Sequence, residues 1–327
     1  MTPSRSTSTV LVTLLVAALG AAVVGVAPAA VTPGRTLTEA APVVALGATH
    51  RHVAWATQAD AGRCTVRMWI PWRKDLYTYK PGLDCREETS TGTGIAAVAL
   101  ASKRVLWLAY TGGNTREWLL FTATPTKRQP KQLRFESADV DGPAPIALGQ
   151  GTSAGVPYAV GRELVYLGEN GSAIFKKTLA APVRSVTAGD GPGNVVVAAL
   201  LADGQVVALT ASGTQVFAAP VAADVTSVAL LVRGVVVQSG TTVRMLRAAA
   251  EETLVLPAGA KVVDTGKGRL ITSTGGTLSA VHPVTGASLV IGEGTADSPV
   301  LGNVEAFGTA WARGNTLNWR SGPLPSS

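Results

Sequence analysis

The sequence has 327 residues, of which 46% are apolar and only 15% are charged, so its composition excludes disorder and allows a sizeable core. It contains 36 glycines and 19 prolines, and Val, Thr and Ala fill its periodic segments, a mixture that favours short strands and tight turns over helices. The net charge of +7 reflects few acids rather than many bases, and without a dense basic stripe it argues against nucleic acid as a partner.

The first segment has the layout of an export signal. Arg5 precedes a charge-free apolar run at 10–26, and the Ala-Pro-Ala stretch at 27–29 supplies the small residues that a signal peptidase accepts. We therefore expect residues 1–29 to be a signal peptide, cleaved after Ala29, and the rest to be secreted or extracytoplasmic. The alternative is an uncleaved membrane anchor, because the run is just long enough to cross a bilayer, which needs roughly 17–25 residues. Membrane contact is expected only through this N-terminus.

The two cysteines, Cys64 and Cys85, both follow the leader. An even number of cysteines in an oxidising compartment indicates a disulfide bond. The alternative of a metal or redox pair has neither the CxxC spacing nor a nearby histidine cluster in its favour. We therefore predict one disulfide.

A pair of short alternating or β-branched runs, joined by a tight turn, recurs along the rest of the chain. Asp203-Gly204 and Gly275-Gly276 join two such pairs, and both dipeptides suit hairpin turns with positive φ. The first runs begin near residues 53, 105, 156, 195, 234, 269 and 308. Their period averages about 42 residues, within the range of roughly 40–50 for propeller blades. The sequence therefore predicts an all-β fold, a single β-propeller at 42–322 with about seven four-stranded blades and a count between six and eight.

Two of the spacings near the N-terminus are longer than the rest. They predict inserted loops at Lys74–Asp84 and Thr124–Gln132. A solenoid or a pair of β-sandwiches would also show repeated hairpins, but the regular period favours a ring.

The two ends of the chain are predicted to meet. The last clear strand ends near Arg320, and Gly322-Pro323 stops further pairing, so the seventh blade lacks an outer strand. The N-terminal segment at 30–41 contains a plausible donor of that strand at Gly34–Ala40, which would protect an open edge. Residues 323–327 are then a tail.

Some of the repeats resemble a known type. Residues 277–290, TLSAVHPVTGASLV, are similar to the repeat of pyrroloquinoline-quinone-type propellers, which reads approximately L-x-A-x-D-x-x-T-G-x-x-x-W. Here His282 replaces the Asp, and Val290 or Ile291 replaces the Trp. Segments 205–217 and 164–175 are degenerate copies, so the resemblance covers about three blades and implies a propeller without a particular activity.

That family includes quinone-dependent dehydrogenases and non-catalytic envelope assembly factors. Its enzymes carry a vicinal cysteine pair, a metal site of Glu, Asn and Asp, and an Asp base. This chain has no adjacent cysteines, and the other groups find no matching positions. The resemblance therefore implies a non-catalytic member that holds no cofactor.

No other motif predicts a catalytic or metal centre. His50 and His52 would share one face of a strand, but zinc needs at least three protein ligands and no third is evident, so we interpret them as a surface or loop pair. The glycine-rich stretches 149–151 and 189–193 lack the features of a phosphate loop and are expected to be turns. His282 precedes a proline in a turn, and no G-x-S-x-G elbow occurs, so no catalytic residue is assigned.

The strongest candidate for a binding surface is an aromatic and basic cluster near the N-terminus. Five of the seven tryptophans lie between Trp55 and Trp118, and Trp, Tyr and Arg are enriched in binding hot spots. The cluster comprises Trp69, Trp72, Arg73, Lys74, Tyr77, Tyr79 and Lys80. The alternative is that Trp55 and Trp107 belong to the core and that the loop 72–80 only shields a blade edge.

We therefore predict an exported, monomeric, non-catalytic propeller that binds or scaffolds an envelope protein, a wall polymer or an anionic surface. The alternative is a quinone-dependent dehydrogenase or a hydrolase with its centre at the propeller axis. The lining of the central channel should distinguish the two. Convergent carboxylates, His or Asn favour the enzyme, and an apolar or Thr/Ala lining favours the scaffold.

Overall fold

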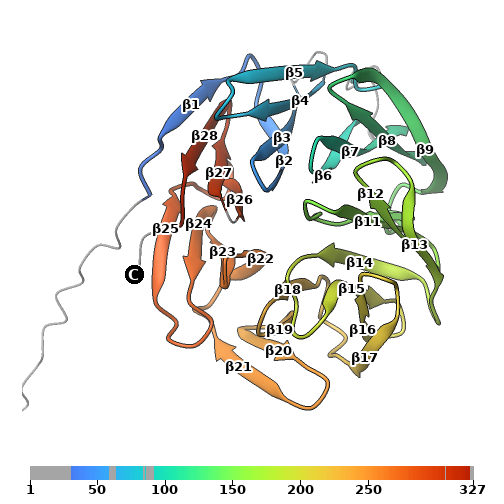
Figure 1. Cartoon of the computed structure of the whole chain (residues 1–327), viewed down its shortest axis with the longest axis vertical. Helices are drawn as coiled ribbons and strands as arrows, with labels where there is room; N and C mark the ends of the chain where they lie inside the picture. The colour runs from blue at the N-terminus through green and yellow to red at the C-terminus, as the bar shows by residue number, and fades with distance from the viewer. Residues whose placement is uncertain (1–30, 59–63, 84, 86–91, 306, 325–327) are drawn as a thin grey trace, which may run out of the picture.

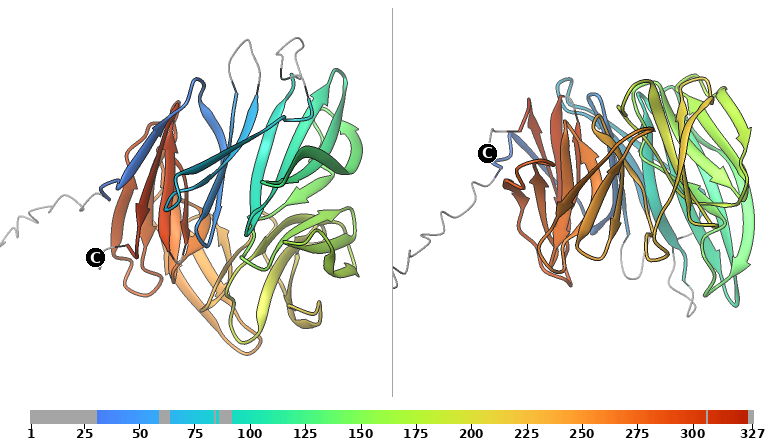
Figure 2. Two further views of the ribbon diagram at one scale, coloured as in Figure 1. Left: turned by 45° about the horizontal axis from the view of Figure 1, so that its top comes forward. Right: turned by 90° about the horizontal axis from the view of Figure 1, so that it is seen from below.

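The computed structural model describes residues 31–58, 64–83, 85, 92–305 and 307–324, which form seven four-stranded antiparallel sheets and no helix. The sheets are blades arranged around a central axis, so the chain is a seven-bladed β-propeller (Figure 1). We use the term central channel for the space along this axis, where propellers have their channel. Two further views show the blades standing side by side in one ring (Figure 2). The all-β propeller of about seven blades is thereby confirmed. The predicted signal peptide lies outside the described residues, which contain no membrane-spanning helix.

In each blade the four strands are numbered here from the channel outward. The first three blades comprise β2 (Val43–Thr49), β3 (His52–Thr57), β4 (Thr65–Ile70) and β5 (Asp75–Tyr79); β6 (Gly94–Ala101), β7 (Arg104–Gly112), β8 (Thr115–Thr124) and β9 (Lys127–Asp139); and β10 (Ile146–Leu148), β11 (Gly155–Val160), β12 (Glu163–Gly168) and β13 (Ala173–Thr178). The last four comprise β14 (Val183–Ala188), β15 (Val195–Leu201), β16 (Gln205–Thr210) and β17 (Gln215–Pro220); β18 (Ala229–Leu231), β19 (Gly234–Ser239), β20 (Thr242–Leu246) and β21 (Glu251–Val255); β22 (Lys261–Gly266), β23 (Arg269–Thr274), β24 (Thr277–Val281) and β25 (Ser288–Gly292); and β26 (Leu301–Glu305), β27 (Gly308–Arg313), β28 (Thr316–Ser321) and β1 (Arg35–Thr38).

The hairpins recognised in the sequence are the second and third strands of each blade. Second strands are covered by neighbouring blades on both faces, which is why all six residues of β3 are buried and why its apolar run is continuous. The first strands β10 and β18 have only three residues each, too few for a periodic signal. Among the fourth strands, β1, β17 and β21 consist only of half-buried and exposed residues, whereas β13 and β25 also contain buried ones.

The prediction of inserted loops at Lys74–Asp84 and Thr124–Gln132 is wrong. The first contains the outer strand β5, and the second contains the turn that leads into β9. The longer spacing in the second blade comes from its long strands, because β9 has 13 residues and pairs along β8.

The ring is closed by the N-terminal strand, as the sequence predicts. β1 pairs with β28 in a register that runs from Arg35 opposite Trp319 to Thr38 opposite Thr316. The next residue, Glu39, is buried at the junction with the first blade. We call this junction between the seventh and first blades the closure seam.

Glu39 fastens the closure seam through two polar contacts. The indole N–H of Trp55 donates to its Oε1 at 3.1 Å, and the guanidinium of Arg67 forms an ion pair with its Oε2 at 2.9 Å. Trp55 and Arg67 belong to β3 and β4, so a residue that follows the last blade's outer strand is held by the first blade.

Glycines let the first strands of neighbouring blades approach each other closely. A Cβ added at Gly266 would lie 1.8 Å from the carbonyl oxygen of Val304, and one at Gly149 would lie 2.0 Å from that of Val186. Both obstacles are backbone atoms of the next blade, which cannot move aside as a side chain can. At these two positions only glycine permits the observed spacing of the blades around the channel.

The predicted disulfide is confirmed. Cys64 and Cys85 are bonded, with their Cα atoms 5.3 Å apart and 21 residues apart in sequence. The bond joins the residue before β4 to the segment after β5, so it fastens the two outer strands of the first blade at one end.

We expect the double variant Cys64→Ala/Cys85→Ala to unfold with a free energy lower by about 3 kcal/mol, because the open chain gains entropy when it unfolds. Urea unfolding with and without dithiothreitol measures this. The reductant should destabilise the wild type and leave the double variant unchanged. Equal unfolding free energies for the oxidised and reduced wild type would contradict the prediction.

Candidate functional site

Two of the cavities open on the same face of the ring. We call it the mouth face: it carries the turns that join the first strand to the second in each blade, and the third strand to the fourth in the first six blades. The larger cavity has a volume of about 400 Å³ and lies at the end of the central channel. Six of the seven blades line this channel mouth with the ends of their first strands, at 49–50, 150–153, 188–190, 230–232, 264–268 and 303–305.

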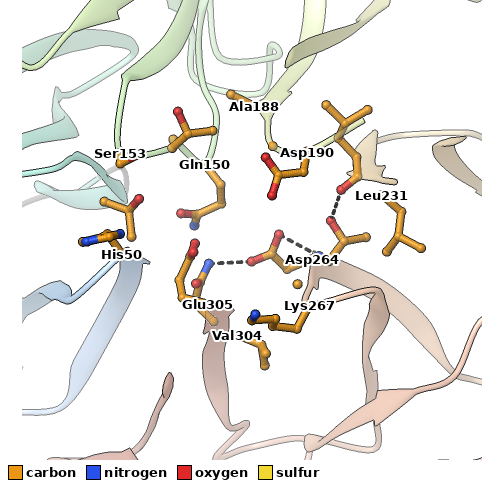
Figure 3. A pocket seen from close by; sticks show the side chains of 18 of the residues that line it. His50, Gln150, Ser153, Ala188, Asp190, Leu231, Asp264, Lys267, Val304 and Glu305 are labelled. Carbon is orange, nitrogen blue, oxygen red and sulfur yellow. Dashed lines mark hydrogen bonds between the residues drawn. The ribbon is translucent and has the colours of Figure 1, made fainter. Parts of the chain in front are cut away.

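The floor of the channel mouth is polar and buried. Asn303 donates a hydrogen bond from Nδ2 to Oδ2 of Asp264 at 2.6 Å, and the backbone N–H of Thr265 donates to Oδ1 of Asp264 at 2.8 Å (Figure 3). Thr49 and Gln150 complete the floor. Within the described part of the chain, three buried oxygens here have no hydrogen-bond partner: Oδ1 of Asn303, Oε1 of Gln150 and Oγ1 of Thr49.

The rim of the channel mouth carries charged side chains. Asp190 and Lys267 are exposed, and Glu305 is half-buried. Figure 3 shows Gln150, Asp190, Asp264 and Lys267 around the same space, although they come from three different blades. Lys267 has a left-handed backbone, with φ of 51°, in the turn that leads from β22 to β23. The mouth thus combines carboxylates, an amide and an ammonium group.

Burial raises the pKa of the Asp264 carboxyl to about 7, and the hydrogen bonds from Thr265 and Asn303 only partly oppose this. The folded protein therefore holds this proton up to about pH 7, whereas an unfolded Asp loses it near the ordinary value of 3.8. Between these values the folded state binds more protons, so this group makes the free energy of unfolding fall as the pH rises.

We expect Asp264→Asn to remove this pH dependence. The variant should gain about 2 kcal/mol of stability relative to the wild type between about pH 5 and about pH 8. Urea unfolding of both proteins at the two pH values measures it. Buried His52 acts in the opposite sense, because burial, with help from Lys103 and His50, lowers its pKa to about 4, but it is common to both proteins. A stability difference independent of pH would contradict the prediction.

The second cavity lies across the closure seam and has a volume of about 310 Å³. We call it the seam pocket. Its walls come from both ends of the chain and from the first blade, and include Arg35, Arg51, Pro71, Trp72, Phe307 and Trp319. A hydrogen bond from the guanidinium of Arg35 to the carbonyl oxygen of Pro71 joins the two sides of the seam.

A guanidinium and two exposed rings form the centre of the seam pocket. The Cζ atom of Arg51 lies 5.5 Å from the ring centroid of Trp72 and 4.8 Å from that of Phe307, both within cation–π range. Trp72 is 44% exposed and Phe307 is 38% exposed. His52 lies edge-on to Trp72, and His50 edge-on to Phe307, so each ring also contacts an imidazole.

The structure divides the aromatic and basic cluster that the sequence singles out. Trp72, Arg73 and Lys74 form the turn between β4 and β5 on the mouth face, where Arg73 pairs with Asp75 at 3.4 Å. Lys80 is exposed at the opposite end of β5.

The remaining members of the cluster point inward. Trp69 is 4% exposed and Tyr79 only 1%, and both pack in the core, where Tyr79 stacks on Trp107. Tyr77 is half-buried beneath the guanidinium of Arg128, at 5.3 Å. Trp69 and Tyr79 are therefore packing residues, because β4 and β5 turn them towards the inside. Only the turn at 72–74 is available to a partner at the seam pocket.

The two histidines are not arranged as the sequence suggests. His50 lies in the turn, with a left-handed φ of 54°, and His52 begins β3 and is buried. Their rings contact Phe307 and Trp72 respectively rather than a common point. Among the described residues, no group of three or more His, Cys, Asp or Glu side chains is placed to hold a metal ion.

Sequence reasoning missed the partners that complete both sites. Arg51 and Phe307 are 256 positions apart and meet only because the ring closes. The stretches 149–151 and 189–193 lie outside the strands, in the connections from β10 to β11 and from β14 to β15, and their convergence at the channel mouth carries no local signal. His282 also lies in a turn, where its Nδ1 accepts from the backbone N–H of Thr285.

A scan against models of protein families finds no match, and a search of curated proteins finds none. Solved structures do match. The Raptor structure from Chaetomium thermophilum has a TM-score of 0.56 and 13% identity over 88% of this chain, which spans only 29% of the Raptor chain. A chain of a Mitotic Checkpoint Complex structure has a TM-score of 0.55 and 16% identity, covering 97% of this chain and 99% of that one.

These likenesses show the fold alone, a WD40-like seven-bladed β-propeller. They give no support that is specific to the pyrroloquinoline-quinone-type repeat. The resemblance of residues 277–290 to that repeat therefore extends to a propeller blade and no further.

Proposed function

We propose that this protein is an exported, non-catalytic β-propeller that binds a partner protein through the seam pocket. One observation carries the proposal: Trp72 and Phe307 are exposed side by side, with Arg51 packed over both rings. Aromatic side chains and Arg contribute most of the binding energy in many protein interfaces. A single exposed ring is common on protein surfaces, whereas a cluster of exposed apolar groups indicates an interaction site. The pocket beside them offers a place for an apolar side chain of the partner.

The chemistry of the seam pocket favours a protein segment over a wall polymer or an anionic surface. Arg35 and Arg51 line the pocket beside the two rings, and Arg73, the residue after Trp72, is paired with Asp75. A segment with an aromatic or aliphatic side chain next to a carboxylate would complement both features. One similar structure is a chain of the Mitotic Checkpoint Complex, which supports a role in assemblies by likeness of fold alone.

The double variant Arg51→Ala/Trp72→Ala tests the proposal. Envelope extract is passed over the domain, the captured protein is identified and purified, and its affinity is measured by calorimetry. We expect the double variant to bind at least roughly thirtyfold more weakly, since truncating a hot-spot residue costs about 2 kcal/mol or more. Val255→Ala, which truncates a 70% exposed side chain on the outer strand β21, should bind like the wild type. Equal binding by all three proteins would exclude the seam pocket as the contact.

Export is part of the proposal. It is supported by the leader pattern at 1–29 and by the Cys64–Cys85 disulfide, which is stable in an oxidising compartment. Sequencing the N-terminus of protein recovered from the envelope or the medium tests it. Ala30 is the expected first residue, and a retained leader in the membrane fraction would instead indicate an anchor.

A second candidate, an enzyme centred on the channel, is favoured by the polar channel mouth. Asp264, Glu305 and Asn303 line it, and a carboxyl with a pKa of about 7 can exchange a proton near neutral pH. Assays with chromogenic esters and glycosides, and with added pyrroloquinoline quinone and calcium, test it. Turnover that disappears in Asp264→Asn would favour the enzyme over the binding module.

A further inference from the structure

The floor of the channel mouth presents hydrogen-bond acceptors that have no donor. Asn303 is 2% exposed, and its Nδ2 donates to Asp264, which fixes the amide so that Oδ1 is the free atom. Oε1 of Gln150 is a second buried acceptor without a partner in the described structure, and the buried Thr49 hydroxyl, which can accept or donate, also has none. Buried acceptors of this kind are normally satisfied, so the site is built to receive a group that donates.

The charge of the channel mouth has the opposite sign to that of the whole chain. The chain carries a net charge of +7, whereas the mouth places the carboxyl groups of Asp190 and Asp264 beside the single ammonium group of Lys267, so above about pH 7 its two carboxylates outnumber that ammonium. Among the described residues no ion pair joins Lys267 to Asp190 or Asp264. A concave site with low-dielectric walls strengthens the field of such charges.

These two features select one class of ligand group. A primary ammonium has three N–H donors, a positive charge and no acceptor, and so complements a floor of oxygens beneath an acidic rim. A carboxylate or phosphate would bring more acceptors and be repelled. A neutral hydroxyl could donate to the buried oxygens but would not balance the negative charge of the carboxylates.

We propose that the channel mouth binds a small aliphatic ligand through a protonated primary amine. The ammonium group lies on the floor among Asp264, Asn303 and Gln150, and Asp190 on the rim adds attraction. The aliphatic part lies in the remainder of the cavity, whose volume of about 400 Å³ is within the usual range of roughly 300–1,000 Å³ for ligand sites. This binding is independent of the seam pocket and of the function proposed for it.

The amine could belong to a free molecule or to a lysine side chain of another protein. Titration calorimetry at low salt and about pH 8 compares two probes: 1,5-diaminopentane, and lysine blocked at its α-amino and carboxyl groups. Both amines are protonated there, because an aliphatic amine has a pKa near 10.4. The matched control ligand is 1,5-pentanediol, which has the same chain and no charge.

We expect the diamine to bind and the diol not to bind. Binding of the diamine alone identifies a free amine, and binding of the blocked lysine as well identifies a side chain. Asp264→Asn should weaken binding roughly tenfold or more, since a charged hydrogen bond contributes about 1.5–3 kcal/mol. Asp190→Asn, at an exposed position where folding is not at risk, should weaken it by a smaller factor.

Asp141→Asn is the matched control protein. Asp141 is exposed in the connection between β9 and β10, on the face opposite the channel mouth, so its loss should leave the affinity unchanged. The proposal is overturned if neither amine binds, if the diol binds as tightly as the diamine, or if both channel-mouth variants bind like the wild type.

Discussion

Removal of all residues up to Ala40 should leave a protein that does not fold as a monomer. The truncation takes away the buried side chain of Val31, the half-buried Leu37 and the buried carboxylate of Glu39. Each apolar side chain contributes about 1.5–3 kcal/mol, and the loss of one partner of a buried ion pair costs about 3 kcal/mol. Together these terms approach the whole stability of a typical domain, about 5–15 kcal/mol. The truncation also exposes the edge of β28, which invites association between chains.

Urea unfolding and light scattering, compared with a chain that begins at Val31, measure this effect. A peptide of residues 31–40 added in trans should restore the monomer, because it supplies the missing strand. Thr36→Val is the matched control, since Oγ1 of Thr36 donates only to Oδ1 of Asn318 at an exposed position, and its effect should stay within about 0.5 kcal/mol. A truncated protein as stable and as monomeric as the longer chain would show that β1 does not close the ring.

Trp107→Ala should lower the free energy of unfolding by about 3–5 kcal/mol. Trp107 is completely buried between the first and second blades. Its ring stacks on Tyr79 and Phe121, with centroids 6.3 and 5.7 Å away, and its indole N–H donates to the carbonyl oxygen of Pro81 at 2.9 Å. Truncation leaves a cavity between two blades that the rigid neighbouring strands cannot fill.

Two further substitutions separate packing from hydrogen bonding at Trp107. Trp107→Phe keeps most of the stack and loses the hydrogen bond, so it should cost about 1–2 kcal/mol. Trp72→Ala removes a tryptophan that is 44% exposed and should cost less than about 1 kcal/mol. Thermal and urea unfolding of the three variants should give this order, and a Trp107→Ala protein as stable as Trp72→Ala would contradict the assignment of the core.

The parts of the fold that the sequence predicts are those with a local signal. β15 and β16 have β-branched runs joined through Asp203-Gly204, and a hairpin follows from that pattern alone. β18 is only Ala-Leu-Leu, and its identity as a first strand depends on the neighbouring blades rather than on its own residues. Ring closure was predictable because Gly322-Pro323 ends the last blade one strand short.

The candidate sites depend on contacts between segments that are distant in sequence, so they were harder to predict from the sequence than the fold was. Trp72 stands out in the sequence, but it lines a pocket only together with Arg51 and Phe307. Phe307 comes close to the other two residues only when the ring closes. Tyr79 would have been assigned to the core had β5 been recognised as a strand, since its residues alternate inward and outward. Asp264 and Asn303 end different first strands, and nothing in either segment indicates that they meet.

The seam pocket contains Arg35 of β1, a strand that is far in sequence from β26, β27 and β28, the other strands of its sheet. A partner bound there would contact β1 and the first and seventh blades at the same time. The affinity for the partner and the free energy of opening the closure seam would then be thermodynamically linked. Above Kd, each tenfold increase in the concentration of free partner would stabilise the closed ring by about 1.4 kcal/mol. Conversely, detachment of β1 from β28 would remove Arg35 from the seam pocket and so weaken partner binding before the blades themselves unfold.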